Sequence, residues 1–479
     1  MSLSRRSLLA GSALAAAAPR LARAAGDQKL LRLQTRQIEV NGKAATRFGV
    51  VQASGAFGLT LSEGEDLDVR LENKLAESSG LHWHGMTPPW RQDGVPYISG
   101  PPIAPGQSAD YKFPARPTGT RWMHSHFGLQ EQDLLAAPLI VRETAAIRSG
   151  VQEVVVLLQD FSWTNPQELF AGLRKPKPEM GMAGGGMNMP GMNMPPGGAS
   201  PPGHAMPMAQ ADLNDITYDA FLANDRTLAD PQVIDVGKNA EVRLRIINAA
   251  SSTNFMIDLG QRTGTLVAVD GNAVAPLPVR QLPLGIAARA DILIRTPADS
   301  AVAVLARCEG RRLQTGVILR PPGAAVTRIA SEAQEAAPAL GLAQEMQLRA
   351  AEPLPERQVD RSVPVDLTGN MAAYIWGMQV HGMGGAPVTV KRGERVELVM
   401  RNSTMMSHPM HLHGHNFQVT EINGQRFAGA MRDSVLVVPQ TTMKIVFDAD
   451  NPGLWAYHCH NLYHMEAGMF TTVVYEGFS

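Results

Sequence analysis

Histidines recur in this chain as pairs separated by one residue. The chain has 13 histidines in 479 residues, and eight of them form four pairs: His82-Trp83-His84, His124-Ser125-His126, His411-Leu412-His413 and His458-Cys459-His460. On a β-strand, residues i and i+2 point to one face and residue i+1 to the other. Each pair can therefore direct two imidazoles at one metal centre, and the last pair can present the Cys459 thiolate to a second centre behind it.

Further candidate ligands flank the last two pairs. His408 precedes His411, while His464 and Met469 follow Cys459 at short spacing. Two histidines, one cysteine and a weak axial methionine form the ligand set of blue-copper sites. A closed structural zinc site needs only four ligands, whereas twelve candidates are present here. We therefore expect several copper ions and not a single zinc.

The composition is that of a chain with several globular domains. At about 150 residues per domain, 479 residues suggest three domains. The hydrophobic content of 44% suffices for packed cores, and the net charge of -1 indicates no nucleic acid or anionic membrane surface as a partner. No apolar stretch is long enough for a transmembrane helix, so we expect no membrane partner.

The first residues have the pattern of an export signal. The twin arginines Arg5 and Arg6 precede an Ala/Gly/Leu-rich stretch, and Ala22-Arg23-Ala24 then resembles a cleavage site. We interpret residues 1–25 as a twin-arginine signal peptide. This interpretation predicts a periplasmic mature protein.

A weak internal repeat predicts an all-β fold. Each copy starts with a glycine and a charged residue, continues as an alternating strand and ends at an asparagine; a second alternating strand follows later. The copies are Gly64–Asn73 with Ala109–Phe113, Gly237–Asn248 with Ala290–Ile294, and Gly393–Asn402 with Met443–Phe447. We expect three consecutive Greek-key β-sandwich domains, which span residues 26–146, 147–325 and 326–479.

Residues 180–208 form a low-complexity segment that contains eight methionines. Its glycine and proline content excludes regular structure. One interpretation is a surface loop whose methionines have no role. The other is a collector of cuprous ions, because soft thioethers select Cu(I). The candidate substrate-copper ligands in this segment are Met187, Met189, Met192 and Met194.

On these motifs the sequence resembles the multicopper oxidase family, which includes laccases and bacterial cuprous oxidases. The resemblance covers nearly the whole mature chain and implies three cupredoxin-like domains and four copper ions. The type 1 ligands that it implies are His408, Cys459, His464 and Met469. The type 2 ligands that it implies are His82 and His411. For the type 3 pair it implies His84, His124 and His460 on one copper, and His126, His413 and His458 on the other.

The resemblance also implies a mechanism. A reducing substrate gives one electron at a time to the type 1 site, and electrons pass from Cys459 through His458 and His460 to the trinuclear cluster. Four electrons there reduce dioxygen to two waters. We expect axial Met469 to lower the type 1 potential relative to an apolar residue, and difficult phenols to be oxidised weakly. We expect the protein to be a monomer.

Two acidic residues are candidates for proton supply. Asp93 matches an acidic residue that the family places near the cluster, although an aspartate before Gly94 also suits a surface turn. Many bacterial members carry a glutamate directly after the second type 1 histidine. Here Met465 has that position, so the candidate is Glu466, one residue further on.

The substrate stays open between three hypotheses. Met406 matches a substrate-copper ligand of bacterial cuprous oxidases and follows Met405, but Thr404 stands where an aspartate is usual. The methionine-rich segment favours a Cu(I) oxidase that serves copper tolerance and also oxidises phenols. The first alternative is a laccase specialised for an organic phenolic substrate. The second is a copper-storage protein or a non-catalytic scaffold, yet a scaffold would be expected to have lost ligands, and none is missing.

Overall fold

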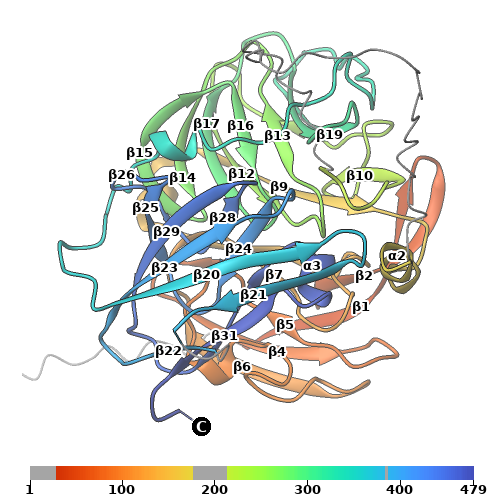
Figure 1. Cartoon of the computed structure of the whole chain (residues 1–479). Coiled ribbons are helices and arrows are strands. Elements are labelled where there is room, and N and C mark those ends of the chain that lie inside the picture. The colour runs from red at the N-terminus through yellow and green to blue at the C-terminus, as the bar shows by residue number, and fades with distance from the viewer. Residues whose placement is uncertain (1–27, 176–212, 383–386, 479) are drawn as a thin grey trace, which may run out of the picture.

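The computed structural model describes residues 28–175, 213–382 and 387–478 (Figure 1). The described residues form 31 β-strands, arranged as three successive pairs of sheets. The helices are short: α1 (Thr144–Ser149), α2 (Pro166–Leu173), α3 (Leu462–Glu466) and the 3-10 turns η1 (Trp90–Gln92) and η2 (Glu345–Gln347). The all-β prediction is confirmed. The proposed signal peptide and the methionine-rich segment lie outside the described residues.

The N-terminal part of the chain forms two four-stranded sheets, ordered β2-β1-β4-β6 and β3-β8-β7-β5. They share one core, to which Leu33 and Leu67 contribute from the first sheet and Leu61 and Leu139 from the second. The strands are β1 (Lys29–Val40), β2 (Lys43–Gln52), β3 (Leu59–Ser62), β4 (Asp66–Asn73), β5 (Leu81–His82), β6 (Ser108–Pro114), β7 (Gly119–Ser125) and β8 (Ala136–Arg142).

The middle part forms a six-stranded sheet, β10-β9-β12-β17-β14-β15, and a five-stranded sheet, β11-β19-β18-β13-β16. The strands of the first sheet are β9 (Gln152–Phe161), β10 (Ala220–Ala223), β12 (Glu241–Asn248), β14 (Gly264–Val269), β15 (Asn272–Val279) and β17 (Arg289–Arg295). Those of the second are β11 (Val233–Asp235), β13 (Phe255–Asp258), β16 (Gln281–Leu284), β18 (Val302–Cys308) and β19 (Gln314–Arg320).

The C-terminal part forms a seven-stranded sheet, β21-β20-β23-β29-β25-β26 with β27 paired to β25, and a five-stranded sheet, β22-β31-β30-β24-β28. The strands of the larger sheet are β20 (Arg361–Asn370), β21 (Ile375–Val380), β23 (Arg395–Asn402), β25 (Phe417–Ile422), β26 (Gln425–Arg426), β27 (Met431–Arg432) and β29 (Thr441–Asp448). Those of the smaller are β22 (Val388–Val390), β24 (His408–Leu412), β28 (Ser434–Val437), β30 (Leu454–Cys459) and β31 (Phe470–Tyr475).

The internal repeat corresponds to one recurring strand pair. Its two strands pair antiparallel in all three parts, as β4 with β6, β12 with β17 and β23 with β29. The asparagine that ends the first strand is buried each time, as Asn73, Asn248 and Asn402. Each of these side chains accepts from the backbone N–H two residues on and donates to two backbone carbonyls. The repeated asparagine therefore fixes the chain as it leaves the strand, which in the third copy leads to His408.

The three parts pack directly on one another. One continuous hydrophobic cluster runs through the middle and C-terminal parts. A smaller cluster joins Trp122 of the N-terminal part to Leu157, Ile247 and Ile286 of the middle part. This packing brings the first and last parts, which carry the histidine pairs, together.

Candidate metal centres

The four histidine pairs lie at strand ends in two sheets. His82 is opposite His124 in the register of β5 with β7, and His411 is opposite His458 in that of β24 with β30. Directly opposed residues of antiparallel strands have Cα atoms about 4.5–5.5 Å apart, so each register holds two imidazoles together. The second histidine of each pair lies just beyond its strand, as the bounds of β5, β7, β24 and β30 show.

The eight paired histidines converge into one group, the eight-histidine cluster: His82, His84, His124, His126, His411, His413, His458 and His460. Three sets of three ring nitrogens each lie within 4.8 Å of one another, namely His82 with His84 and His411, His84 with His124 and His460, and His126 with His413 and His458. The Nε2 atom of His458 is 3.2 Å from that of His126 and 3.0 Å from that of His413. Such crowding of ring nitrogens suits a bound cation.

Six cluster histidines contact a protein oxygen through one ring nitrogen, which leaves the other nitrogen for a metal: His82, His84, His124, His411, His413 and His458. Two buried aspartates, Asp93 and Asp433, contact four of these histidines. Asp93 lies 3.2 Å from Nδ1 of His82 and 2.9 Å from Nδ1 of His413, and Asp433 lies 3.1 Å from Nε2 of His84. Three buried nitrogens consequently have no hydrogen-bond partner in the described structure: Nε2 of His82, Nδ1 of His84 and Nε2 of His411. Metal-bound histidines show this arrangement, with the second N–H held by a carboxylate or carbonyl.

Burial favours the neutral imidazole at most of the candidate ligands, and the neutral form is the one that binds metals. Burial first, and then the neighbouring histidines, hold the pKa well below its usual value in eight candidate ligands: His84, His124, His126, His408, His411, His413, His458 and His460. A cluster of neutral donors fits copper.

These pKa shifts predict that the metal-free protein is sensitive to acid. Histidine has a pKa of about 6.5 in an unfolded chain. Since the folded pKa values are lower, the unfolded state binds more protons as the pH falls, and stability decreases. We expect the free energy of unfolding of the metal-free protein to be constant above about pH 7 and to fall steeply below about pH 6.5. Urea unfolding across this range tests it; equal stability at about pH 5.5 and 7.5 contradicts it.

The cysteine site combines His408, Cys459 and His464. The Sγ atom of Cys459 is 3.8 Å from Nδ1 of His408 and 3.7 Å from Nδ1 of His464, and the two Nδ1 atoms are 3.1 Å apart. Met469 is fully buried, and its carbonyl accepts from the Cys459 N–H at 3.0 Å. Burial raises the pKa of the Cys459 thiol, so a metal ion is required to stabilise its thiolate.

The outer nitrogen of each histidine at the cysteine site has a polar neighbour. The Oγ1 atom of Thr404 is 2.8 Å from Nε2 of His408. Asp215 is 3.1 Å from Nε2 of His464 and accepts from Asn461 at 3.0 Å. The ring of Trp376 lies against that of His464 in a tilted arrangement, with centroids 4.1 Å apart. His464, Asp215 and Trp376 are all buried, so this edge of the site is closed by protein.

The Asp215 carboxylate predicts a measurable shift in the potential of the cysteine site. Burial alone would raise the pKa of Asp215, but His464 and the hydrogen bonds from His464, Asn461 and Tyr374 together lower that pKa, so the group is negative. A negative charge beside a copper ligand favours the cupric state. We therefore expect Asp215→Asn to raise the reduction potential on the order of tens of millivolts, by Coulomb's law at this range. Redox titration of the blue absorption measures it, and an unchanged or lower potential would refute it.

The two acidic residues predicted for proton supply lie in different surroundings. Asp93 is 1% exposed and bridges His82 and His413, so it is not a surface-turn residue. Glu466 is exposed at the end of α3, and its role stays a prediction. The sequence reasoning missed Glu131, a buried carboxylate 2.9 Å from Nδ1 of His124. Burial raises the pKa of Glu131 well above its usual value. The position of Glu131 five residues after His126 was the available signal.

The predicted substrate methionines differ in exposure. Met405 is 52% exposed, whereas Met406 is buried and donates its backbone N–H to Thr404. Thr404, which stands where the cuprous-oxidase pattern has an aspartate, therefore makes hydrogen bonds to both Met406 and His408. The four methionines predicted at 187, 189, 192 and 194 lie outside the described residues.

Comparison with known proteins identifies the family. Three family profiles described as multicopper oxidase match residues 33–146, 152–319 and 356–477. A multicopper oxidase of Mycobacterium tuberculosis, MmcO, is 31% identical over 86% of this chain and 80% of its own length. The chain belongs to the multicopper oxidase family. Copper resistance protein A of Escherichia coli is 26% identical over 87% of both chains. Among solved structures, the multicopper oxidase Fet3p has a TM-score of 0.73 at 18% identity, covering 93% of this chain and 90% of its own.

As a multicopper oxidase, the protein is a copper-dependent oxidoreductase that uses oxygen as the electron acceptor. The predicted fold, a series of cupredoxin-like domains, is confirmed by these structural relatives. Laccase-1 of Botryotinia fuckeliana, 24% identical over 86% of this chain and 75% of its own, is a further relative. In the described ranges no helix has the length and apolar character needed to cross a membrane.

Proposed function

We propose that this multicopper oxidase binds four copper ions and couples the oxidation of Cu(I) to the reduction of dioxygen to two waters. The observation that carries the proposal is the division of eleven buried or half-buried donors into the cysteine site and three histidine groups. Ring nitrogens without a hydrogen-bond partner remain on His82, His84 and His411. We assign the type 1 copper to the cysteine site, where Met469 would be the fourth ligand. Type 2 copper is assigned to His82 and His411, and the type 3 pair to the two remaining groups of three.

Copper in these sites supplies one-electron acceptance at the cysteine site and multi-electron reduction of dioxygen at the cluster. The chain's own residues connect and protect the two centres. Cys459 is covalently continuous with His458 and His460, which reach the cluster. Three buried acids touch cluster histidines: Asp93, Glu131 and Asp433. Asp433 is paired with Arg289, so Asp93 and Glu131 are the candidates to hold protons there.

Cu(I) is the proposed substrate because of the thioether at the surface near the cysteine site. Met405 is exposed and lies three positions before His408. Asn402 and Thr404 hold this segment through hydrogen bonds to Met406 and His408. Thioethers bind cuprous ions. The relatives named copper resistance protein A support a role in copper tolerance, and the twin-arginine pattern supports a periplasmic location. The relatives named laccase support the alternative, a laccase that oxidises an organic phenol.

Oxygen uptake by the copper-loaded protein tests the proposal, with Cu(I) and a dimethoxyphenol as alternative donors at matched concentration. We expect faster uptake with Cu(I) and four Cu(I) oxidised per dioxygen. Met405→Leu, which keeps the volume but removes the thioether, is expected to slow Cu(I) oxidation several-fold and leave phenol oxidation unchanged. Met346→Leu, at a half-buried methionine of η2, is the matched control.

The outcomes separate the candidate functions. Fast phenol turnover with negligible Cu(I) oxidation would make the protein a laccase. Two Cu(I) per dioxygen would mean that peroxide is the product. No uptake with either donor at full copper loading would overturn the oxidase proposal in favour of copper storage.

A further inference from the structure

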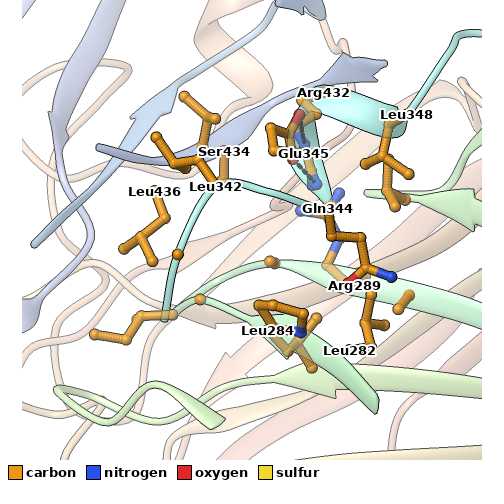
Figure 2. Close-up of a pocket in the computed structure, with 18 residues that line it drawn as sticks. Leu282, Leu284, Arg289, Leu342, Gln344, Glu345, Leu348, Arg432, Ser434 and Leu436 are labelled. Atoms are coloured by element: carbon orange, nitrogen blue, oxygen red, sulfur yellow. Dashed lines mark hydrogen bonds and ion pairs between the residues drawn. The ribbon is translucent and has the colours of Figure 1, made fainter. Parts of the chain in front are cut away.

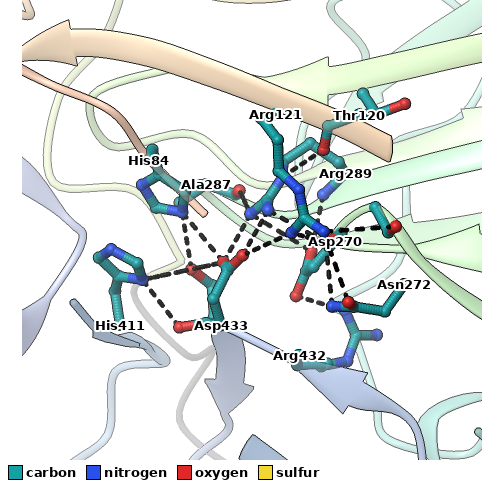
Figure 3. A network of polar contacts seen from close by, with 12 residues as sticks. His84, Thr120, Arg121, Asp270, Asn272, Ala287, Arg289, His411, Arg432 and Asp433 are labelled. Carbon is teal, nitrogen blue, oxygen red and sulfur yellow. Dashed lines mark hydrogen bonds and ion pairs between the residues drawn. The ribbon is translucent and has the colours of Figure 1, made fainter. Parts of the chain in front are cut away.

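A buried ion-pair network lies behind the eight-histidine cluster (Figure 3). We call it the Asp433 network. It contains three arginines and three carboxylates, so its formal charges balance: Arg121, Arg289, Arg432, Asp270, Glu345 and Asp433. Its central contact is a two-pronged pair, in which Arg289 donates through Nη1 to Oδ1 of Asp433 at 2.6 Å and through Nη2 to Oδ2. Both side chains are almost completely buried.

The network touches the cluster through Asp433, and the neighbouring Ser434 adds a hydroxyl. Oδ1 of Asp433 is 3.1 Å from Nε2 of His84, and the Asp433 backbone carbonyl is 2.7 Å from Nδ1 of His411. The hydroxyl of Ser434 lies 3.2 Å from the same His84 nitrogen and 3.1 Å from the same His411 nitrogen. The rings of His84 and His411 stack, with centroids 3.8 Å apart. These contacts determine which nitrogen of each ring remains for a metal.

The network also joins the three parts of the chain. His84 and Arg121 belong to the N-terminal part, Arg289 begins β17 in the middle part, and Asp433 lies between β27 and β28 in the C-terminal part. Arg121 and Arg289 both donate to the backbone carbonyl of Asp270, at 2.6 and 3.2 Å. Candidate copper ligands in the described chain come only from the first and last parts. The middle part therefore reaches the cluster through Arg289.

The surroundings leave little freedom for Asp433 to move. Gly85, at φ +83°, follows His84, and a Cβ atom there would come within 2.5 Å of Arg289 and 2.7 Å of Asp433. On the other side, Arg289 and Ser434 line a cavity of about 50 Å³ (Figure 2). Leu282, Leu284 and Leu436 line it too, so it admits at most a few waters.

The charged groups of the network shift one another's pKa values. Burial, followed by Arg289, lowers the pKa of Arg121 to about 10, while Asp433 and Asp270 act in the opposite direction. Burial alone would lower the pKa of Arg289, but Asp433 and Asp270 outweigh it and raise that pKa. Removal of Asp433 would leave two buried guanidinium groups facing His84 without their carboxylate, and an unpaired buried charge is strongly unfavourable.

We propose that the Arg289–Asp433 pair is the device through which the ligand-free middle part of the chain positions His84 and His411 for copper. Asp433 is a positioning residue, and Arg289 fixes its carboxylate with the geometry that only a guanidinium provides. The inference rests on the proposed assignment of copper to the eight-histidine cluster. It gives the middle part a role in the metal centre, although it supplies no ligand.

Copper retention under a graded chelator tests the inference. The copper-loaded Asp433→Asn protein is expected to release copper from the cluster at 10- to 100-fold lower chelator concentration than the wild type, as measured for lost partners of metal-bound histidines. The blue absorption of the cysteine site is expected to persist, because none of the network contacts reaches it. Copper counting and the electron paramagnetic resonance of type 2 copper report the loss. Arg289→Lys keeps the charge but not both hydrogen bonds, so it is expected to shift retention in the same direction by less.

Asp291→Asn is the matched control, because Asp291 is an equally buried carboxylate in the same region. Its partners are Thr120, Arg243 and Arg245. It is expected to lower the unfolding temperature and leave copper retention at the wild-type value. Wild-type retention in both Asp433→Asn and Arg289→Lys, or equal losses in Asp291→Asn, would overturn the inference. Failure of the proposed function would show separately, as a wild type that holds copper but consumes no oxygen.

Discussion

Cys459→Ser is expected to remove the blue absorption and reduce oxygen uptake with every donor to background. Cys459 supplies the single thiolate of the cysteine site, and its backbone is continuous with two cluster histidines, so the substitution removes a copper ligand and the electron path together. Serine offers a harder oxygen that is not ionised at neutral pH and does not replace a soft thiolate. Absorption spectra, copper counts and oxygen uptake of the copper-loaded variant measure the effect.

The other cysteine provides the control for this variant. Cys308 is equally buried, in β18 of the middle part, and burial raises the pKa of its thiol as it does for Cys459. Cys308→Ser is expected to lower stability by burying a hydroxyl, while activity per folded molecule stays at the wild-type level. Retention of the blue absorption or of substantial activity in Cys459→Ser would refute the type 1 assignment.

Asp93→Asn is expected to lower oxygen reduction about 10- to 100-fold, the usual effect of losing a partner of metal-bound histidines. The Asp93 carboxylate accepts from His413 and lies 3.2 Å from Nδ1 of His82, whose hydrogen bond goes to the Asp93 backbone carbonyl. One residue therefore contacts a proposed type 2 ligand and a proposed type 3 ligand. An amide keeps the size but offers one acceptor oxygen in place of two. The rate of reoxidation of the reduced protein by dioxygen isolates this step from substrate oxidation.

Asp110→Asn, at an exposed aspartate of β6 that pairs with Arg70, is the control and is expected to match the wild type. A reoxidation rate of Asp93→Asn within about twofold of the wild-type rate would mean that the Asp93 carboxylate has no role in oxygen reduction at the cluster. If copper is lost along with the rate, orientation is the main role. A slow rate at full copper loading would point to proton supply.

Much of the fold followed from local patterns. The alternation of apolar and polar residues, ended by Asn73, Asn248 and Asn402, predicts paired strands because period 2 and a capping amide are properties of short segments. The histidine spacing likewise predicts shared metal centres, since residues i and i+2 lie on one face whatever the rest of the chain does. The structure added the register, in which His82 meets His124 and His411 meets His458.

The carboxylates that orient the histidines were decided by the tertiary structure. Asp433 is 349 residues from His84, Asp93 is 320 residues from His413, and Asp215 belongs to the middle part while His464 is near the C-terminus. Nothing in the local sequence marks such a pair, because it exists only after the three parts pack together. The sequence by itself thus determined the donor atoms and their grouping along strands. Packing between distant strands decided which nitrogen of each ring is free for copper, and which buried charges hold it there.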